Sequence, residues 1–142
     1  MDVMERSLPY LMQGIVARVE RAIHKRAREH GLTIEEIHVL FRLLAKDYQT
    51  VKELAEQTGI EPSTLSRLLV RMQKKGMLCK RRQSDDNRAV KVMLTDKGRD
   101  LAQARHPTFR EYEKIILRGF SAQEAQSFRV ALLRMAQNIE DI

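Results

Sequence analysis

The chain has 142 residues, a hydrophobic fraction of 43% and a formal net charge of +7. This length is that of one typical domain, and the apolar fraction is enough for an ordinary core. The single cysteine, Cys79, excludes an intramolecular disulfide framework and fits a reducing compartment, so we expect a cytoplasmic protein. The N-terminus carries early acids, and no segment reaches about 18 uninterrupted apolar residues, so we expect neither a signal peptide nor an anchor.

The N-terminal part of the chain predicts a long helix followed by a shorter one. Apolar residues from Leu8 onward recur at the spacing of one helical face, and this pattern ends before His30. A capping box of Thr33 and Glu36 then opens a second helix that runs to about Lys46. We expect its inner face to consist of Ile37, Leu40, Phe41 and Leu44.

Two further helices are predicted on either side of a short turn. Thr50 and Glu53 make a second capping box, and Gly59 stops the helix that it opens. Pro62 stands near the first position of the next helix, where its missing N–H costs nothing, and apolar residues follow at helical spacing. Two helices that meet across the turn of residues 58–61 form the helix-turn-helix pattern.

After Gly76 the apolar period changes from helical to alternating. Residues 77–82 and 89–94 are short strand-like runs joined by turn formers at residues 83–87, which predicts a β-hairpin. Three helices followed by a hairpin are typical of the winged-helix arrangement. The hairpin is its wing.

The C-terminal part of the chain predicts two more helices. Thr95 caps the first, which extends to about residue 118 with Gly98 and Pro107 as weak points. A third capping box, Ser121 with Glu124, opens the last helix, whose apolar residues recur at spacings of three and four. Both ends of the chain are therefore predicted to be amphipathic helices.

The expected fold class is mainly α with a small β-hairpin wing, a winged helix-turn-helix whose N- and C-terminal helices form a dimerisation domain. We expect residues 1–32 to hold the N-terminal helix of that dimerisation domain and residues 33–98 the winged helix-turn-helix. Residues 99–142 would supply the C-terminal helices of the dimerisation domain.

The positive charge is concentrated in the helix-turn-helix and the hairpin. Residues 61–91 contain nine basic and three acidic side chains, a net charge of +6 out of the total of +7. Such concentration exceeds what solubility requires and indicates a polyanionic partner. Double-stranded DNA, an acidic protein and membrane headgroups are the candidates at this point.

The helix that begins at Pro62 carries small hydroxyl residues at its start and an arginine one turn later. These groups suit a DNA major groove, because hydroxyls meet base edges or phosphates and an arginine fork matches guanine O6 and N7. At the hairpin, Arg88 could enter the narrow, negative minor groove, and Asp86 could hold a neighbouring arginine in place. The expected DNA-binding residues are Ser63, Thr64, Ser66, Arg67, Lys80, Arg81, Arg82 and Arg88, with Asp86 stabilising the wing.

These residues also have structural readings. Ser63 and Thr64 suit helix caps, Arg67 suits local pairing on a helix surface, and the basic cluster at residues 80–82 suits a solvated strand edge. Cys79 is either a half-buried structural cysteine or a thiol activated by neighbouring cations. The four histidines form no i,i+4 pair and have no cysteine nearby, so we expect no metal site within one chain and no cofactor.

The motifs resemble the MarR family of winged-helix transcriptional regulators over nearly the whole chain. The most specific piece is the wing pattern Asp-x-Arg, five residues, then Leu-Thr, present here as Asp86-Asn87-Arg88, AVKVM and Leu94-Thr95. The sequence DKGR follows it, as is usual in the family. The helix-turn-helix VKELAEQTGIEPSTLSRLLVRMQKKGML is similar throughout.

This resemblance implies a homodimer whose terminal helices interlock, a recognition helix in the major groove of each half-site, and repression relieved by a small ligand or by oxidation. Ser63, Thr64 and Arg67 match contacting positions of the recognition helix, and Arg88 matches the minor-groove arginine. An apolar or aromatic effector would occupy an apolar cleft between the dimer helices and the winged domain. Asn87 replaces an arginine common in the wing. The first helix lacks a cysteine, so the family's peroxide-sensing mechanism is not carried over.

The sequence thus predicts a homodimeric, sequence-specific DNA-binding transcription regulator, a ligand-responsive repressor of a near-palindromic operator with half-sites about 34 Å apart. The alternative is a winged-helix module that docks an acidic protein partner. No Gly-rich phosphate loop, HExxH motif or GxSxG elbow occurs, so we expect no enzymatic activity. No membrane partner is expected.

Overall fold

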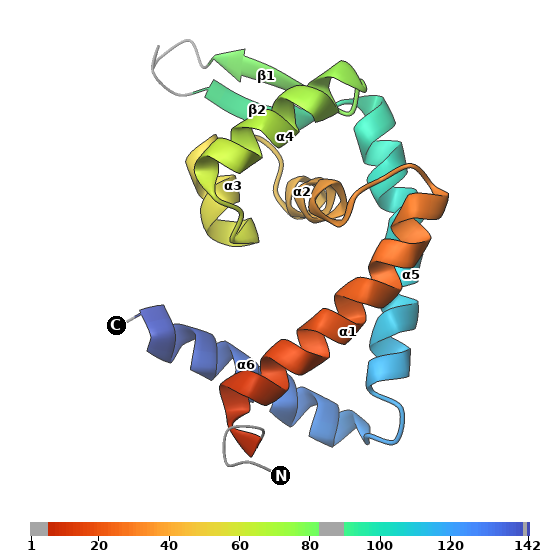
Figure 1. Ribbon diagram of the computed structural model, residues 1–142, viewed down its shortest axis with the longest axis vertical. Coiled ribbons are helices and arrows are strands. Elements are labelled where there is room, and N and C mark those ends of the chain that lie inside the picture. The colour runs from red at the N-terminus through yellow and green to blue at the C-terminus, as the bar shows by residue number, and fades with distance from the viewer. Residues whose placement is uncertain (1–5, 83–89, 141) are drawn as a thin grey trace. The chain divides into compact units, whose positions relative to one another are not determined.

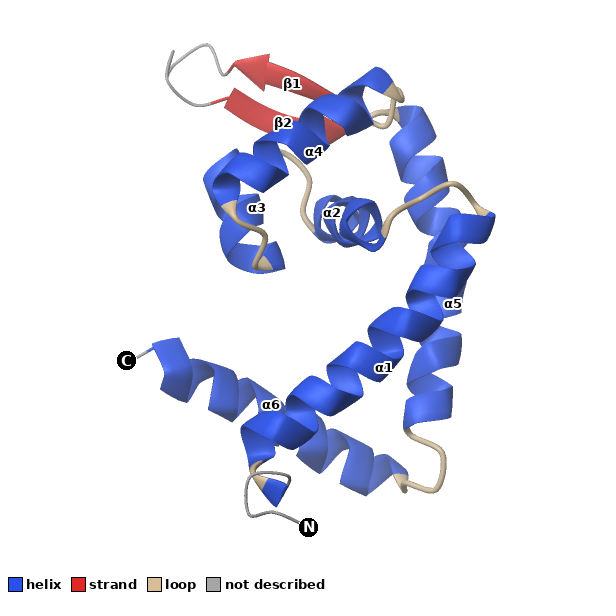
Figure 2. Ribbon diagram, in the orientation of Figure 1, coloured by secondary structure: helices blue, strands red, loops and turns tan. Residues whose placement is uncertain are grey.

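The computed structural model describes residues 6–82, 90–140 and 142, and for residues 106–109 it describes the backbone alone. The elements are α1 (Leu8–Glu29), α2 (Ile34–Ala45), α3 (Val51–Thr58), α4 (Pro62–Lys74), β1 (Leu78–Arg82), β2 (Val90–Leu94), α5 (Asp96–Ile116) and α6 (Ala122–Glu140). Figures 1 and 2 show the helices and the two-stranded hairpin. The predicted fold class, mainly α with a hairpin wing, is confirmed. Within the described residues, no helix combines the length and apolar character needed to cross a membrane.

Capping boxes fix the starts of α2, α3 and α6. Before α2, the Thr33 hydroxyl accepts the Glu36 N–H at 3.2 Å, and the Glu36 carboxylate accepts the Thr33 N–H at 3.1 Å. The same reciprocal pair of hydrogen bonds joins Thr50 with Glu53 and Ser121 with Glu124. Each box satisfies two backbone N–H groups near the helix start that would otherwise lack a partner. All three predicted boxes are confirmed.

The core of the winged part is built around α2, which contacts α1, α3, α4 and β2 (Figure 1). Ile37 and Leu40 are buried as predicted, but Val39 and Leu43 are fully buried as well, while Phe41 and Leu44 are only half-buried. A helix with neighbours on several sides buries more than one stripe. The prediction of a single inner face for α2 was therefore correct for only part of the core. The fully buried partners on other elements include Leu54, Leu65, Leu69, Met72 and Val92.

The hairpin pairs β1 with β2 in antiparallel register from Leu78 opposite Leu94 to Arg82 opposite Val90. The predicted first strand began one residue earlier, at Met77, but that residue donates its N–H to the Met72 carbonyl at 3.0 Å and so belongs to the turn that follows α4. Gln49, before α3, exchanges two backbone hydrogen bonds with Val92 at 2.7 and 3.1 Å. This isolated bridge ties the hairpin to the α2–α3 connection.

Gly98 allows α5 to start close against the hairpin. A β-carbon at this position would lie 2.0 Å from the Met77 carbonyl oxygen, far inside van der Waals contact. The sequence suggested that Gly98 and Pro107 weaken the helix, yet α5 is continuous through both and ends at Ile116. At Gly98 the missing side chain is needed for packing, and this outweighs the cost of glycine in a helix.

The chain divides between residues 106 and 107 into two compact units. In the first unit, Ile23 and Ala27 of α1 are buried, whereas the N-terminal half of that helix leaves its apolar side chains exposed. These exposed residues are Leu8, Leu11, Met12, Ile15 and Val16, which we call the α1 apolar face. In the second unit, Arg129 of α6 forms an ion pair with Glu113 of α5, and Ala125 is buried.

Candidate nucleic-acid interface

Helix α4 is held by an apolar inner face that leaves its polar start exposed. Leu65, Leu69 and Met72 are completely buried and Leu68 is 2% exposed. The side chains of the four residues predicted to meet DNA on this helix all lie at the exposed end: Ser63, Thr64, Ser66 and Arg67. Because the inner residues recur at helical spacing, packing fixes the rotation of α4 about its own axis. The structure thus brings the four predicted residues together on one surface.

The turn between α3 and α4 fixes the start of α4 relative to the helix before it. Gly59 ends α3 in the left-handed conformation, with φ of 70°, which favours glycine. The Thr58 hydroxyl donates to the Leu54 carbonyl at 2.7 Å and accepts the Ile60 N–H at 3.3 Å. These contacts stabilise the turn between the two helices, and the predicted helix-turn-helix is confirmed.

Glu61 caps α4, a role that the sequence analysis did not assign. Its carboxylate accepts the Thr64 N–H at 3.1 Å, the Thr64 hydroxyl at 3.4 Å and the Ser63 hydroxyl. The hydrogen bonds from Ser63 and then Thr64 lower the pKa of Glu61 from 4.5 to about 2. The cap is therefore ionised from neutral pH down to about pH 2. An acidic residue directly before a proline at the first helical position was the available signal.

The basic cluster of β1, residues 80–82, is exposed but divided between two faces of the hairpin. Lys80 lies opposite Val92, Arg81 opposite Lys91 and Arg82 opposite Val90. Since side chains alternate along a strand, Lys80 and Arg82 share one face and Arg81 occupies the other. The structure therefore does not bring these three cations together at one point.

Cys79, also on β1, is half-buried opposite Met93 and has a free thiol. Among the described residues, no group of three or more histidine, cysteine or acidic side chains is arranged to hold a metal ion.

Two predicted residues, Asp86 and Arg88, lie outside the described residues, as does the Asn87 substitution between them. Their roles remain predictions from the sequence.

The base of the hairpin is anchored by Asp47, which the sequence analysis also missed. Its Oδ1 accepts the backbone N–H of Leu94 at 3.0 Å, and its Oδ2 accepts from the Arg99 guanidinium at 2.7 Å. One carboxylate thus joins the α2–α3 connection, β2 and α5. The next residue, Tyr48, is exposed and has a positive φ of 58°, which is rare for a residue other than glycine.

The end of α4 is anchored by an ion pair with α2. The Lys75 ammonium lies 2.7 Å from the carboxylate of Glu36, whose side chain is only 2% exposed. The Lys75 carbonyl in turn accepts from the Lys97 ammonium at 2.7 Å. Both ends of α4 are therefore held by carboxylates, Glu61 at the start and Glu36 at the end.

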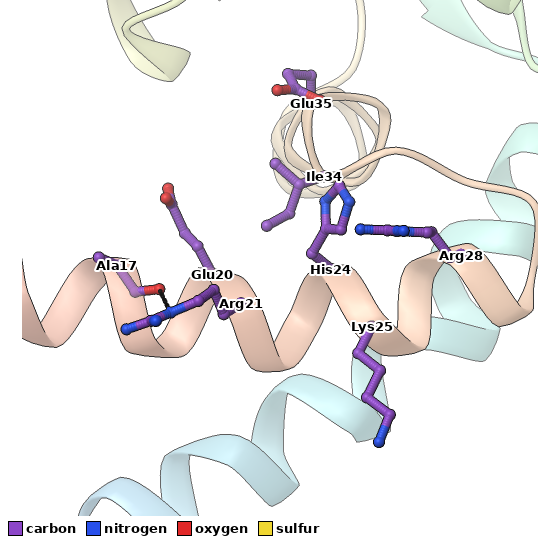
Figure 3. Close-up of a pocket in the computed structure, with 8 residues that line it drawn as sticks. All are labelled: Ala17, Glu20, Arg21, His24, Lys25, Arg28, Ile34 and Glu35. Carbon is purple, nitrogen blue, oxygen red and sulfur yellow. Dashed lines mark hydrogen bonds between the residues drawn. The ribbon is translucent and has the colours of Figure 1, made fainter.

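A pocket of about 650 Å³ lies between α1 and the start of α2 (Figure 3). Its lining consists of Ala17, Glu20, Arg21, His24, Lys25, Arg28, Ile34 and Glu35. In Figure 3, His24 and Arg28 extend towards Ile34, whereas Lys25 points to the other side of α1. The Arg21 guanidinium donates to the Ala17 carbonyl at 3.3 Å. Five of these eight residues have charged side chains, whereas the resemblance implies an apolar pocket.

Comparison with known proteins places this arrangement among winged-helix regulators. A crystal structure of a MarR family transcriptional regulator from Silicibacter pomeroyi is 31% identical, with a TM-score of 0.87 over 96% of this chain and 92% of that one. A MarR family regulator from Listeria monocytogenes, solved with a 26mer DNA, has a TM-score of 0.90 but 19% identity, over 96% of this chain and 91% of that one. At this low identity, the similarity to the Listeria monocytogenes structure is evidence for the fold alone.

Sequence comparison identifies the family to which this chain belongs. The model of the family described as transcriptional regulator SarA/Rot matches residues 21–105. The HTH-type transcriptional regulator YdgJ of Bacillus subtilis (strain 168), described as uncharacterized, is 30% identical over 112 residues, 79% of this chain and 68% of YdgJ. The chain belongs to the winged-helix transcriptional regulators of the MarR and SarA/Rot type. The predicted family is confirmed, and it is a family of regulators rather than of enzymes.

Proposed function

We propose that this regulator is a homodimeric, sequence-specific DNA-binding repressor whose release from DNA is controlled by a small molecule. The observation that carries the proposal is the exposed start of α4, where Ser63, Thr64, Ser66 and Arg67 share one surface of the helix-turn-helix. This surface belongs to the segment that contains nearly all of the net positive charge. The DNA present in the crystals of the Listeria monocytogenes relative supports the same assignment.

In the proposed complex, the start of α4 enters the major groove. The hydroxyl oxygens of Ser63 and Thr64 would meet base edges, the Ser66 hydroxyl would meet a base edge or a phosphate, and Arg67 would pair with a guanine. At the hairpin, Lys80 and Arg82 would contact phosphates from one face of β1 and Arg81 from the other. From the sequence, Arg88 is assigned to the adjacent minor groove and Asp86 to holding the wing.

Dimerisation is proposed from apolar surface that one chain leaves uncovered. The α1 apolar face has side chains up to 59% exposed, at Leu8, and on α6 Phe128, Leu133 and Ile139 expose 47%, 72% and 66%. Exposed apolar stripes on amphipathic helices suit association with a second copy. Residues 1–32 and 99–142 would then form the dimerisation domain and residues 33–98 the DNA-binding domain. The two-fold symmetry of the dimer would produce a near-palindromic operator.

The effector would bind in the pocket between α1 and α2. The charged lining favours an aromatic molecule with an acidic group, because Arg28 can pair with an anion while Ile34 contacts the ring. Benzoate is a suitable probe, with benzyl alcohol as its uncharged counterpart. We expect benzoate at millimolar concentration to weaken operator binding, and Arg28→Ala to abolish this effect. Equal effects of the two compounds would contradict an anionic effector.

The proposal is tested by selecting bound sequences from a random duplex pool with the purified full chain. We expect a near-palindrome with half-sites about one helical turn apart. On that sequence, Arg67→Ala and Arg88→Ala should each weaken binding, and each lost phosphate contact should lower the slope of log K against log salt by about one. Arg110→Ala, an exposed arginine on α5, is the matched control. Failure to enrich any sequence would overturn the proposal and favour docking to an acidic protein.

A further inference from the structure

Glu61 is an unusual residue at the start of a helix that is proposed to enter DNA. It is the one acidic side chain in residues 61–74, among three basic ones, and it is exposed. A carboxylate at this point is repelled by phosphates, so it opposes rather than supports general affinity for DNA. Besides capping α4, Glu61 can therefore contribute to DNA binding through selectivity rather than through general affinity.

The hydrogen bonds around Glu61 determine which groups the start of α4 can offer to a base. The hydroxyls of Ser63 and Thr64 both donate to the carboxylate, so their single protons are engaged and towards a further partner they can act only as acceptors. The Thr64 N–H is capped by the same carboxylate. The first residues of the helix therefore present hydrogen-bond acceptors beside Glu61, while the donors of Ser66 and Arg67 lie further along α4.

An acceptor surface distinguishes among the bases in a major groove. Cytosine presents its N4 amino donor there, and a glutamate accepts from that group. Guanine presents the acceptors N7 and O6, which repel a carboxylate, and adenine places the acceptor N7 beside its amino donor, so its edge is a poorer match than that of cytosine. Thymine offers an acceptor and a methyl group. Cytosine is therefore the base that suits this surface best.

We propose that Glu61 is a specificity-determining residue that selects a cytosine at one position of each operator half-site. This inference rests on the proposed DNA-binding function of α4. The low pKa of about 2 keeps the carboxylate ionised under all ordinary binding conditions. The buried inner face of α4 fixes the direction in which the capped end points. Repulsion of phosphates lowers binding to all sequences, so the cytosine contact raises the difference between the operator and other DNA.

The test compares sequence selection by the wild type and by Glu61→Gln, which has the same shape and no charge. We expect the variant to lose a preference of about tenfold for cytosine at one base pair of each half-site, with other positions unchanged. We also expect its affinity for random DNA to rise several-fold at low salt. Glu56→Gln, which removes the same charge from an exposed position on α3, should leave the selected sequence unchanged.

A second variant separates selectivity from folding. Glu61→Asp keeps a charged cap, so its thermal melting should match the wild type, while its shorter side chain should weaken the cytosine preference. If the wild type selects an operator and both Glu61 variants select the same bases with the same preferences, the inference fails and the DNA-binding function stands. If the wild type enriches no sequence, the proposed function itself fails.

Discussion

The winged part of the chain and its terminal helices use the same kinds of apolar residue with opposite outcomes. In the winged part, Leu43, Leu54 and Leu69 are completely buried, whereas Leu8 of α1 and Leu133 of α6 expose 59% and 72% of their surface. Burying such a side chain contributes about 1.5–3 kcal/mol. The winged part obtains this contribution within one chain, while the exposed apolar residues of the terminal helices do not. In the proposed dimer, folding and association would therefore depend on different segments.

The largest effect on stability should follow from a substitution in the buried core of the winged part. Leu69→Ala leaves a cavity where Leu69 is fully buried, so we expect the free energy of unfolding to fall by about 2–5 kcal/mol in urea titrations. Val70→Ala, at a position 43% exposed on the same helix, should change it by less than about 0.5 kcal/mol. Similar losses for the two variants would show that α4 is not held by its inner face.

A smaller effect is expected at the ion pair that ends α4. Lys75→Ala leaves the buried Glu36 carboxylate without its cation, and we expect a loss of about 1–3 kcal/mol in the same titrations, since Lys75 itself is partly exposed. Adding Glu36→Gln should restore part of the loss. Lys74→Ala, at the exposed neighbouring position, is the control. If Lys75→Ala leaves the free energy of unfolding unchanged, water replaces Lys75 in stabilising the charge of the Glu36 carboxylate.

A substitution in the α1 apolar face should weaken dimerisation without a comparable loss of core stability. Ile15→Glu places a charge where Ile15 is 48% exposed, so we expect the dimer dissociation constant to rise at least about tenfold by analytical ultracentrifugation. The concentration dependence of Tm expected for a dimer should weaken accordingly. Gln13→Glu adds the same charge at an exposed position of the same helix and is the control. A wild type that is monomeric at micromolar concentration would contradict the proposal that the α1 apolar face serves dimerisation.

The smallest effect is expected at Tyr48, where the winged part contains local strain. Tyr48→Gly removes the cost of a positive φ for a residue with a β-carbon, so we expect an increase in stability of up to about 1 kcal/mol. Tyr48→Ala should show no such increase, because alanine meets the same steric restriction. A loss of stability in Tyr48→Gly would show that the exposed ring makes contacts worth more than the strain.

Local rules predicted the helices and the hairpin because their signals lie within a few residues of each other. The capping boxes that begin at Thr33 and Thr50 and the stop at Gly59 are examples. The sequence did not reveal Asp47 or the ion pair of Glu36 with Lys75, because those partners come together only when distant elements pack. The predicted residues of α4 do share one exposed surface, but sequence spacing did not show that Glu61 engages their hydroxyls.

The carboxylate of Asp47 has a consequence for the order of folding. Its partners Leu94 and Arg99 are 47 and 52 positions away along the chain, so both contacts close long loops, whereas each helix forms from neighbours. Contacts of such sequence separation carry a large loop-closure entropy and form late. We therefore expect the Leu94 amide to exchange with solvent only when the hairpin separates from the helices, so that its protection would report the cooperative opening of the winged part.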